Sequence, residues 1–599
     1  MKLQYIIMSC IAIAGGVFTA AAQDDLTKEI TIAKDIVPQE RDANRIAQLP
    51  ELSLPSFSQK KLHWTDRAVA APLAPSFSLL APASYLATMD RYPYRGYLDL
   101  GYFPTFQVGL SAGYRLYDTE ATKLNAWVQY NGSQYKADGV VDNKITYKNH
   151  AAHIGLNLTH QVSEAGTLSG ELGYSFHSFN FPTGELFPLV ECPTGVKGHQ
   201  SEGYTQSVNR FNIGLGWNGH AGQFDYHAAA GYQFFGFAKP PYEENSDKPL
   251  NDIDAYHANH LNLNLGAFYN LTENHGVGLD FDILNTANKN IMLFTLNTIT
   301  GNFDPWTEDG NNSGYYSIKP YYQGKGDNYS VKIGLQVNHL WSFGGATHAG
   351  ADIDLGWSPA SKFAVSATIQ SGNVYQNSIS EHFAEDNYLN PALYIKPSWN
   401  KGLVDLKLLI GPFAGASFEI FGGYGKLVDW ANQYVLGGKY AETLAGAHYG
   451  LDMDSYHYGI AFNYQYRSLA SLRVSYEGAP QDIDKGYMYW GDRAKNAFEV
   501  AVEVSPIDAL DLGLSYELRT GRAIYELIGI STVSSIAQTP YEKITMANVN
   551  SLDFSARYAI NPQFSVWAQV ENLLNKKWDI DYGLPNKGVT GLVGIGYKF

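Results

Sequence analysis

The sequence contains little cysteine and little charge. Only two of its 599 residues are cysteines, and Cys10 lies in an apolar stretch at the amino terminus. If that stretch is removed, Cys192 stands alone, so neither an internal disulfide nor a cysteine-based metal site can form. Charged residues make up 17% of the chain, below the share of about 25% that is usual for soluble domains.

Long apolar segments and catalytic motifs are also missing. After residue 23 no apolar run reaches the length of about 18 residues that a membrane-spanning helix needs. The sequence has no HExxH, no GxSxG, no P-loop and no dinucleotide-binding glycine pattern. We therefore predict no enzymatic activity, no metal site and no cofactor. The net charge of −16 disfavours nucleic acid as a partner.

The first 23 residues have the pattern of a secretory signal. A basic Lys2 precedes the apolar stretch Leu3–Phe18, and small residues follow up to Ala22. This pattern predicts export with cleavage near Ala22 or Gln23. A single membrane anchor is the alternative, but the apolar run is short and lacks a basic flank on its far side.

Aromatic residues and glycine are abundant. The chain holds 43 Tyr, 29 Phe, 11 Trp and 58 Gly. This composition suits a membrane β-barrel, in which only every second residue of a strand faces lipid and aromatic rings lie at both membrane interfaces.

From Gly96 onward the chain alternates between apolar and polar residues in roughly twenty segments, each near the length of about 9–11 residues that crosses a membrane obliquely. Clear examples lie at 98–102, 124–130, 261–269, 353–357, 510–518 and 552–558. Backbone groups in lipid must pair with one another, so such a sheet has to close. We predict an all-β fold in which residues 94–599 form a transmembrane antiparallel barrel of about 22 strands.

The polar side of these alternations predicts the residues that face the lumen. The charged candidates and two tryptophans with the same parity are Trp127, Asp352, Asp354, Glu517, Arg519, Asp553, Arg557 and Trp567. Aromatic rings in a lumen can stack on sugar faces, or they can pack against an inserted segment of the chain. A catalytic group built from the inward carboxylates is a further alternative that no motif supports.

The region 24–93 differs from the rest. It includes one segment that could form a short strand, Glu29–Pro38, and five later prolines that interrupt any longer element. We interpret it as a short periplasmic arm or partial lumen insert. A disordered leader is the alternative.

The last two predicted strands resemble a known family. Phe564–Trp578 reads FSVWAQVENLLNKKW, which is similar to the penultimate strand and turn of TonB-dependent receptors, with Leu574 and Trp578 in place of the commoner Phe and Tyr. Gly591–Phe599 is similar to that family's terminal strand. The resemblance implies a receptor-like outer-membrane barrel, and the barrel of this family has 22 strands.

The chain departs from this family at its amino terminus. TonB-dependent receptors place a globular plug before the barrel, and the 70 residues from 24 to 93 are too few for one. The run from Ile30 to Ala43 resembles the leader of a plug-lacking, receptor-like group from Bacteroidota. Within it, Ile30, Ile32, Ile36 and Val37 form a candidate energy-coupling segment, although short strands match such a pattern by chance.

The carboxyl terminus carries a candidate assembly signal. Val593, Ile595, Tyr597 and Phe599 alternate with small or polar residues, and the chain ends on an aromatic residue. This resembles the signal that the barrel-assembly machinery recognises. An ordinary edge strand is the alternative, but terminal residues usually fray.

Together these features predict a protein of the outer membrane of a Gram-negative bacterium. Its expected partners are outer-membrane lipid, the barrel-assembly machinery during biogenesis, and periplasmic or outer-membrane proteins. The favoured hypothesis is uptake or passage of a polar solute. The alternative is a non-transporting barrel subunit of a larger outer-membrane complex.

Overall fold

The computed structural model describes a long β-sheet domain. The described ranges are 94–104, 106–138, 144–163, 166–180, 205–238, 255–296, 303–308, 312–341, 345–375, 398–436, 445–479, 494–527, 541–580 and 585–599. No helix within these ranges has the length and apolar character needed to cross a membrane. The predicted signal and arm, and the candidate coupling residues Ile30, Ile32, Ile36 and Val37, lie outside the described residues.

The described strands form one large sheet of 25 strands, antiparallel in all but one pairing, and one separate pair. Three strands of the large sheet only continue other strands. They are β16 (Val374–Tyr375), which follows β15 along β17, and β23 (Ala523–Leu527) and β24 (Tyr541–Thr545), which extend β22 and β25. The other 22 strands form the wall. The wall strands are β1 (Gly96–Phe103), β2 (Gln107–Asp118), β3 (Thr122–Asp138), β4 (Lys144–Ser163), β5 (Gly166–Asn180), β6 (Thr205–Ala221), β7 (Phe224–Phe237), β8 (His257–Asn270), β9 (His275–Lys289), β12 (Ser313–Lys325), β13 (Tyr329–Leu340), β14 (Ala346–Ala360), β15 (Phe363–Gln370), β17 (Ser398–Phe413), β18 (Ala416–Leu436), β19 (Ala445–Tyr466), β20 (Ala470–Gly478), β21 (Asn496–Ile507), β22 (Leu510–Thr520), β25 (Val549–Ala559), β26 (Phe564–Glu571) and β27 (Thr590–Lys598).

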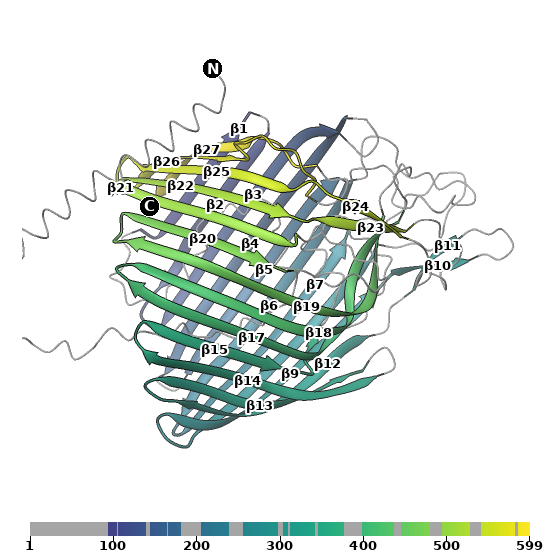
Figure 1. The fold of residues 1–599 in the computed structure, drawn as a ribbon, viewed down its shortest axis with the longest axis vertical. Coiled ribbons are helices and arrows are strands. Elements are labelled where there is room, and N and C mark those ends of the chain that lie inside the picture. Colours follow the sequence, from purple (N-terminus) through teal and green to yellow (C-terminus); the bar gives the residue numbers. More distant parts are fainter. Residues whose placement is uncertain are drawn as a thin grey trace, which may run out of the picture. The chain divides into compact units, whose positions relative to one another are not determined.

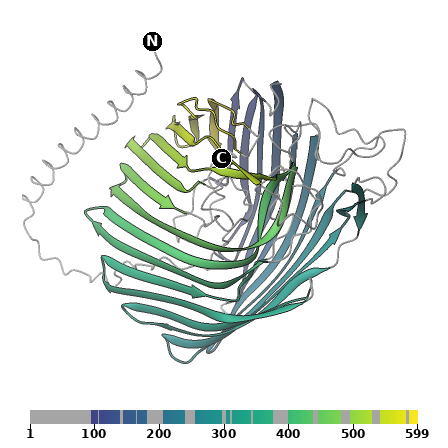
Figure 2. The same ribbon diagram turned by 45° about the vertical axis from the view of Figure 1, so that its right-hand side comes forward.

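The sheet closes into a barrel because its first and last strands pair. β1 lies antiparallel to β27, with register partners from Tyr97 and Lys598 to Tyr102 and Val593. Figure 2 shows the yellow carboxyl-terminal strands beside the purple amino-terminal ones. The predicted all-β, 22-strand antiparallel barrel is therefore confirmed.

The five other strands lie outside the 22-strand count. β10 (Ile291–Leu296) and β11 (Phe303–Glu308) form a separate hairpin (Figure 1), and β16 (Val374–Tyr375) pairs with β17. β23 (Ala523–Leu527) pairs with β24 (Tyr541–Thr545) and also runs parallel to the end of β18.

The two faces of the wall differ as the alternation predicts. Large apolar side chains project from one face, with Leu335 and Val593 exposed by 64% and 60%. On the same face, Phe564, Tyr597, Phe599 and Tyr114 stack in sequence, with ring centroids 4.5, 5.6 and 5.8 Å apart. We call this apolar side the outer face and the opposite, polar side the inner face, because a closed barrel in lipid must turn its apolar side outward.

Connections alternate between short and long. Those from β6 to β7, β14 to β15 and β21 to β22 leave two residues between strands. The segment from Gly423 to Leu451 is mostly strand, since β18 and β19 stay paired out to Leu436 and Ala445. Apolar and polar residues do not alternate in this part of the sequence, and a strand outside lipid is not required to alternate.

Asparagine shapes the turn that follows β26, within the segment that resembles TonB-dependent receptors. Asn572 and Asn575 adopt positive φ angles of 51° and 49°, a conformation that asparagine tolerates better than most residues. The Asn572 side chain accepts a hydrogen bond from the Lys576 backbone N–H at 3.1 Å and donates one to the Lys576 carbonyl at 2.9 Å. These bonds explain why asparagine serves at this point of the motif.

We expect the two faces of β8 to respond differently to a new charge. Leu265 lies on the outer face and is 38% exposed. Leu265→Arg should lower the free energy of unfolding by about 2 to 4 kcal/mol, because the guanidinium meets lipid. Asn262→Arg, on the inner face of the same strand, should cost much less. Urea unfolding in lipid vesicles measures both losses, and equal losses would contradict the assignment of the faces.

Candidate functional site: the polar inner wall

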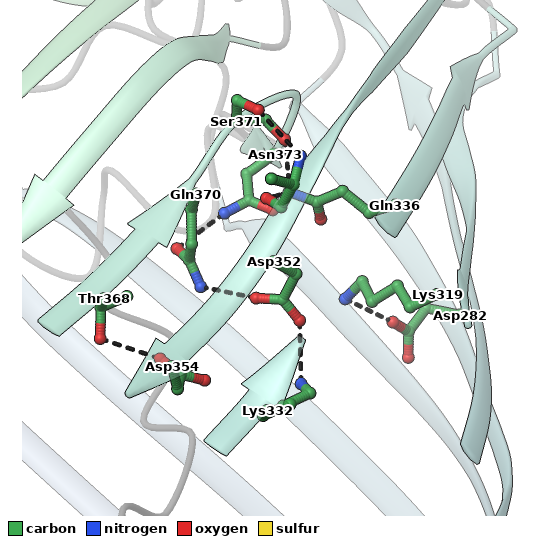
Figure 3. Close-up of polar contacts among 11 residues, drawn as sticks. Asp282, Lys319, Lys332, Gln336, Asp352, Asp354, Thr368, Gln370, Ser371 and Asn373 are labelled. Atoms are coloured by element: carbon green, nitrogen blue, oxygen red, sulfur yellow. Dashed lines mark hydrogen bonds and ion pairs between the residues drawn. The ribbon is translucent and has the colours of Figure 1, made fainter. Parts of the chain in front are cut away.

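A network of charged side chains lies on the inner face across β9, β12, β13, β14 and β15. The Lys319 ammonium lies 3.0 Å from the Asp282 carboxylate, and the Lys332 ammonium lies 2.8 Å from that of Asp352. Figure 3 shows both pairs and their neighbours. Asp352 is only 6% exposed, so its charge depends on the lysine for compensation.

The network repeats one arrangement twice. β9 contributes Asp280 and Asp282, and β14 contributes Asp352 and Asp354, each pair with one intervening apolar residue. The register places Lys319 opposite Asp280 and Lys332 opposite Asp354, yet each lysine bonds the other aspartate of its pair. Each unit therefore has two carboxylates and one ammonium, so it carries a net negative charge.

Amide and hydroxyl groups hold the carboxylates of β14 in position. Gln370 donates to Asp352 at 3.1 Å, and Thr368 donates to Asp354 at 2.8 Å. Beyond β15, Gly372 adopts a φ of +76°, and the chain turns there toward β13. The Gly372 carbonyl accepts a hydrogen bond from the Asn338 side chain of β13 at 2.8 Å. Such a shell restricts the rotamers of the charged groups and fixes the charge pattern of the wall.

Tyr321 joins this network to an inner-wall pocket. Its ring lies over Gly278, where a Cβ would overlap it, and Lys332 lies 4.9 Å from the ring centroid. Phe268 stacks on Tyr321 at 6.0 Å. The two rings form one side of a pocket of about 370 Å³ whose other lining groups include Gln161, Thr167, Asn218 and His227. Aromatic and amide groups together suit a polar solute with an apolar face.

A second charged region lies on β20, β21, β22 and β25. Glu499 and Glu517 are direct register partners, and Arg519 forms an ion pair with Glu517. Asp553 accepts a hydrogen bond from Ser551 at 2.7 Å. Glu499 and Glu517 lie directly opposite each other, and like charges in that position repel and destabilise a sheet. A cation that approaches this side of the lumen would reduce that repulsion.

The remaining predicted lumen residues lie apart from both regions. Arg557 forms an ion pair with Asp99 at 2.7 Å, and the Trp567 ring lies over Gly101 and Gly594. Trp127 lies over Gly155 on the neighbouring strand. The structure thus places the eight predicted residues on the inner face but divides them among separate groups.

The sequence prediction did not include four charged members of the first network, namely Asp280, Asp282, Lys319 and Lys332. A usable signal exists for the aspartates, because Val277, Leu279 and Phe281 alternate with them. The lysines could not be matched to their partners, since that requires the register between strands.

The carboxyl-terminal residues that were predicted as an assembly signal lie on the outer face. Val593 and Ile595 project from the outer face at 60% and 59% exposure, and Tyr597 and Phe599 join the aromatic stack. Their role as an assembly signal remains a prediction. Among the described residues, no group of three or more His, Cys, Asp or Glu side chains is arranged to hold a metal ion.

The Lys332–Asp352 pair should be important for stability. Lys332→Met should lower the free energy of unfolding by about 3 kcal/mol, because it leaves a buried carboxylate uncompensated. Adding Asp352→Asn should recover most of that loss. Lys426→Met, which breaks a more exposed pair with Asp454 at 3.7 Å, should cost less than about 1 kcal/mol. Urea unfolding in vesicles tests all three, and a double variant as unstable as Lys332→Met would contradict the pairing.

Comparison with known proteins finds likeness only at the level of structure. No protein-family model matches the sequence, and no curated protein matches it significantly. The siderophore receptor PirA from Acinetobacter baumannii is similar in structure, with a TM-score of 0.61 and 10% identity over 84% of this chain and 80% of that chain. The copper transporter OprC gives 0.58 and 10%, over 84% and 80%. The outer membrane transporter YddB from Escherichia coli gives 0.56 and 11%, over 85% and 81%. The chain therefore has the fold of the TonB-dependent outer-membrane receptors, a closed antiparallel barrel of 22 strands.

Proposed function

We propose that this chain is an outer-membrane barrel through which a polar solute passes, with residues 24–93 partly filling the lumen in place of a globular plug. The inner wall is the observation that carries the proposal. Its charged side chains keep contact with the lumen, as shown by Lys319 and Lys407, whose side chains are 26% and 48% exposed. A wall that only had to fill space would hold apolar side chains, because buried charges are costly.

The width of the barrel supports passage. An eight-stranded barrel is filled by its own side chains, whereas 22 strands enclose a lumen that needs a plug to close it. Structures of similar fold are named as a siderophore receptor and a copper transporter. Similarity in fold does not transfer their substrates, so we propose a polar solute without naming it.

The location and biogenesis of the protein follow from the same proposal. The amino-terminal 23 residues would direct export, with cleavage near residue 22 or 23, and Val593, Ile595, Tyr597 and Phe599 would present the last strand to the assembly machinery. The candidate energy-coupling segment is the one that contains Ile30, Ile32, Ile36 and Val37, and the plug-lacking resemblance does not require that it couple.

A second function, as a non-transporting subunit of an outer-membrane complex, is favoured by one observation. β18 and β19 have 21 and 22 residues, about twice what a membrane crossing needs, and β10 and β11 form a separate hairpin. Strands that extend beyond the membrane offer backbone and side chains to a partner protein.

Planar-bilayer recordings distinguish the two functions. We expect the full-length mature chain to conduct weakly, and a variant without residues 24–93 to show larger and steadier conductance, because the lumen insert is gone. If both proteins fold and neither conducts, the transport proposal is wrong. The complex hypothesis then predicts co-purification of a defined partner from native membranes.

The carboxylates of the second charged region should make the pore prefer cations. Glu499→Lys should move the reversal potential in a salt gradient toward anion preference, because Glu499 is exposed on the inner face. The matched control is Asp454→Lys, which changes the charge by the same amount next to Tyr424 on the outer face. A similar shift in both variants would show that total charge, and not the inner wall, determines selectivity.

A further inference from the structure

The seam between β1 and β27 is the one place in the described wall where neighbouring strands come from opposite ends of the barrel sequence. The two strands pair over six positions, from Tyr97 and Lys598 to Tyr102 and Val593. A contact that closes so long a loop costs more chain entropy than one within a hairpin. Opening of the wall is therefore expected to begin at this seam, unless other contacts oppose it.

Trp567 is the first such contact. It projects from the inner face of β26, and its indole lies over Gly594 of β27 and Gly101 of β1. A Cβ at either glycine would overlap the ring. One side chain therefore contacts both strands of the seam, and this is possible because both carry glycine at this level.

An ion pair crosses the same seam. The Arg557 guanidinium of β25 donates to the Asp99 carboxylate of β1 at 2.7 Å, and it also lies 3.4 Å from the Ser565 hydroxyl of β26. A Cβ at Gly596 of β27 would meet the Asp99 carboxylate. Asp99 is 5% exposed, and a buried carboxylate without an oppositely charged partner destabilises the fold, so Arg557 compensates it. The pair spans four strands.

Two further contacts join β2 to the carboxyl-terminal segment across β1. Gln107 of β2 donates a hydrogen bond to Thr590 of β27, and both residues are 5% exposed. On the outer face, Phe599 stacks on Tyr114 of β2 with ring centroids 5.8 Å apart and planes inclined by 15°. Both rings pass over Gly96, where a Cβ would overlap them.

We propose that Asp99, Gln107, Arg557, Trp567 and Thr590 form a seam lock, which keeps the first and last strands together and prevents the wall from opening laterally. Glycine in a strand is unfavourable in itself, yet Gly101, Gly594 and Gly596 lie where these side chains must cross. Contacts that cross the seam form only once the barrel has closed, so they stabilise the closed state without assisting any single hairpin.

The matched control for Trp567 is Trp127, whose ring also lies over a glycine on the inner face. Its partner Gly155 belongs to β4, which pairs with β3 over 17 positions away from the seam. Trp567→Ala should lower the temperature at which the folded barrel loses its compact form on an unheated gel by at least about 5 °C. Trp127→Ala should produce less than half of that shift. Equal shifts would overturn the proposal.

A disulfide across the seam separates the lock from general packing. Leu100 and Ile595 are register partners on the outer face, and antiparallel partners lie within the Cα distance that a disulfide needs. In a Cys192→Ser background, the pair Leu100→Cys and Ile595→Cys should stabilise Trp567→Ala more than it stabilises the parent protein, because it also replaces the lost seam contact. It should stabilise Trp127→Ala only as much as the parent, since a disulfide constrains the unfolded chain in every variant. Equal gains in all three proteins would overturn the proposal.

Hydrogen exchange shows where opening begins. In Trp567→Ala, amides of β1 and β27 should lose protection before those of β13 and β14, and a uniform loss around the wall would overturn the proposal. If Trp567→Ala does not fold, Asp99→Asn replaces it. Its control, Asp282→Asn, removes a carboxylate that pairs with Lys319 far from the seam. Only Asp99→Asn should expose β1 and β27 selectively, and selective exposure in both variants or in neither would refute the lock.

Discussion

Pairing of the backbone is the constraint on which the whole structure depends. A peptide N–H or C=O left unpaired in lipid costs several kcal/mol, so a sheet in a membrane must have no free edge. Here the register between Tyr97 and Lys598 removes the last edge. Closure then gives every strand one face toward lipid and one toward the lumen, and the alternation of Leu335 with Gly334 and Gln336 follows from that geometry.

On the inner face, aromatic rings that cover glycines lie among charged side chains. Aromatic rings lie over glycines on neighbouring strands, as Trp127 does over Gly155 and Tyr321 over Gly278. A ring in this position covers the backbone that glycine leaves bare. Charged groups such as Lys319 and Lys332 lie among these ring-covered glycines. The inner face is therefore polar, and its neighbouring strands are also packed against each other through the rings.

The sequence was most informative where lipid acts on it. Segments that cross the membrane alternate, and the barrel class and the strand number could both be expected from the sequence. The sequence between Gly423 and Leu451 does not alternate, so the pattern gives no sign of the strands that pair there. The link between Lys332 and Asp352 was hidden for another reason, because pairing across strands depends on register and not on spacing in the chain.

The sequence by itself determined the fold class and, in the segments that alternate, which residues share a face, since side chains on a strand point to opposite sides with a period of two. Only the tertiary structure decided which inward residues meet. Asp99 and Arg557 are 458 positions apart and lie 2.7 Å from each other, because closure of the barrel brings its first strand beside its last. No local pattern encodes that proximity, since it arises from the number of strands, their register and the closure of the sheet together.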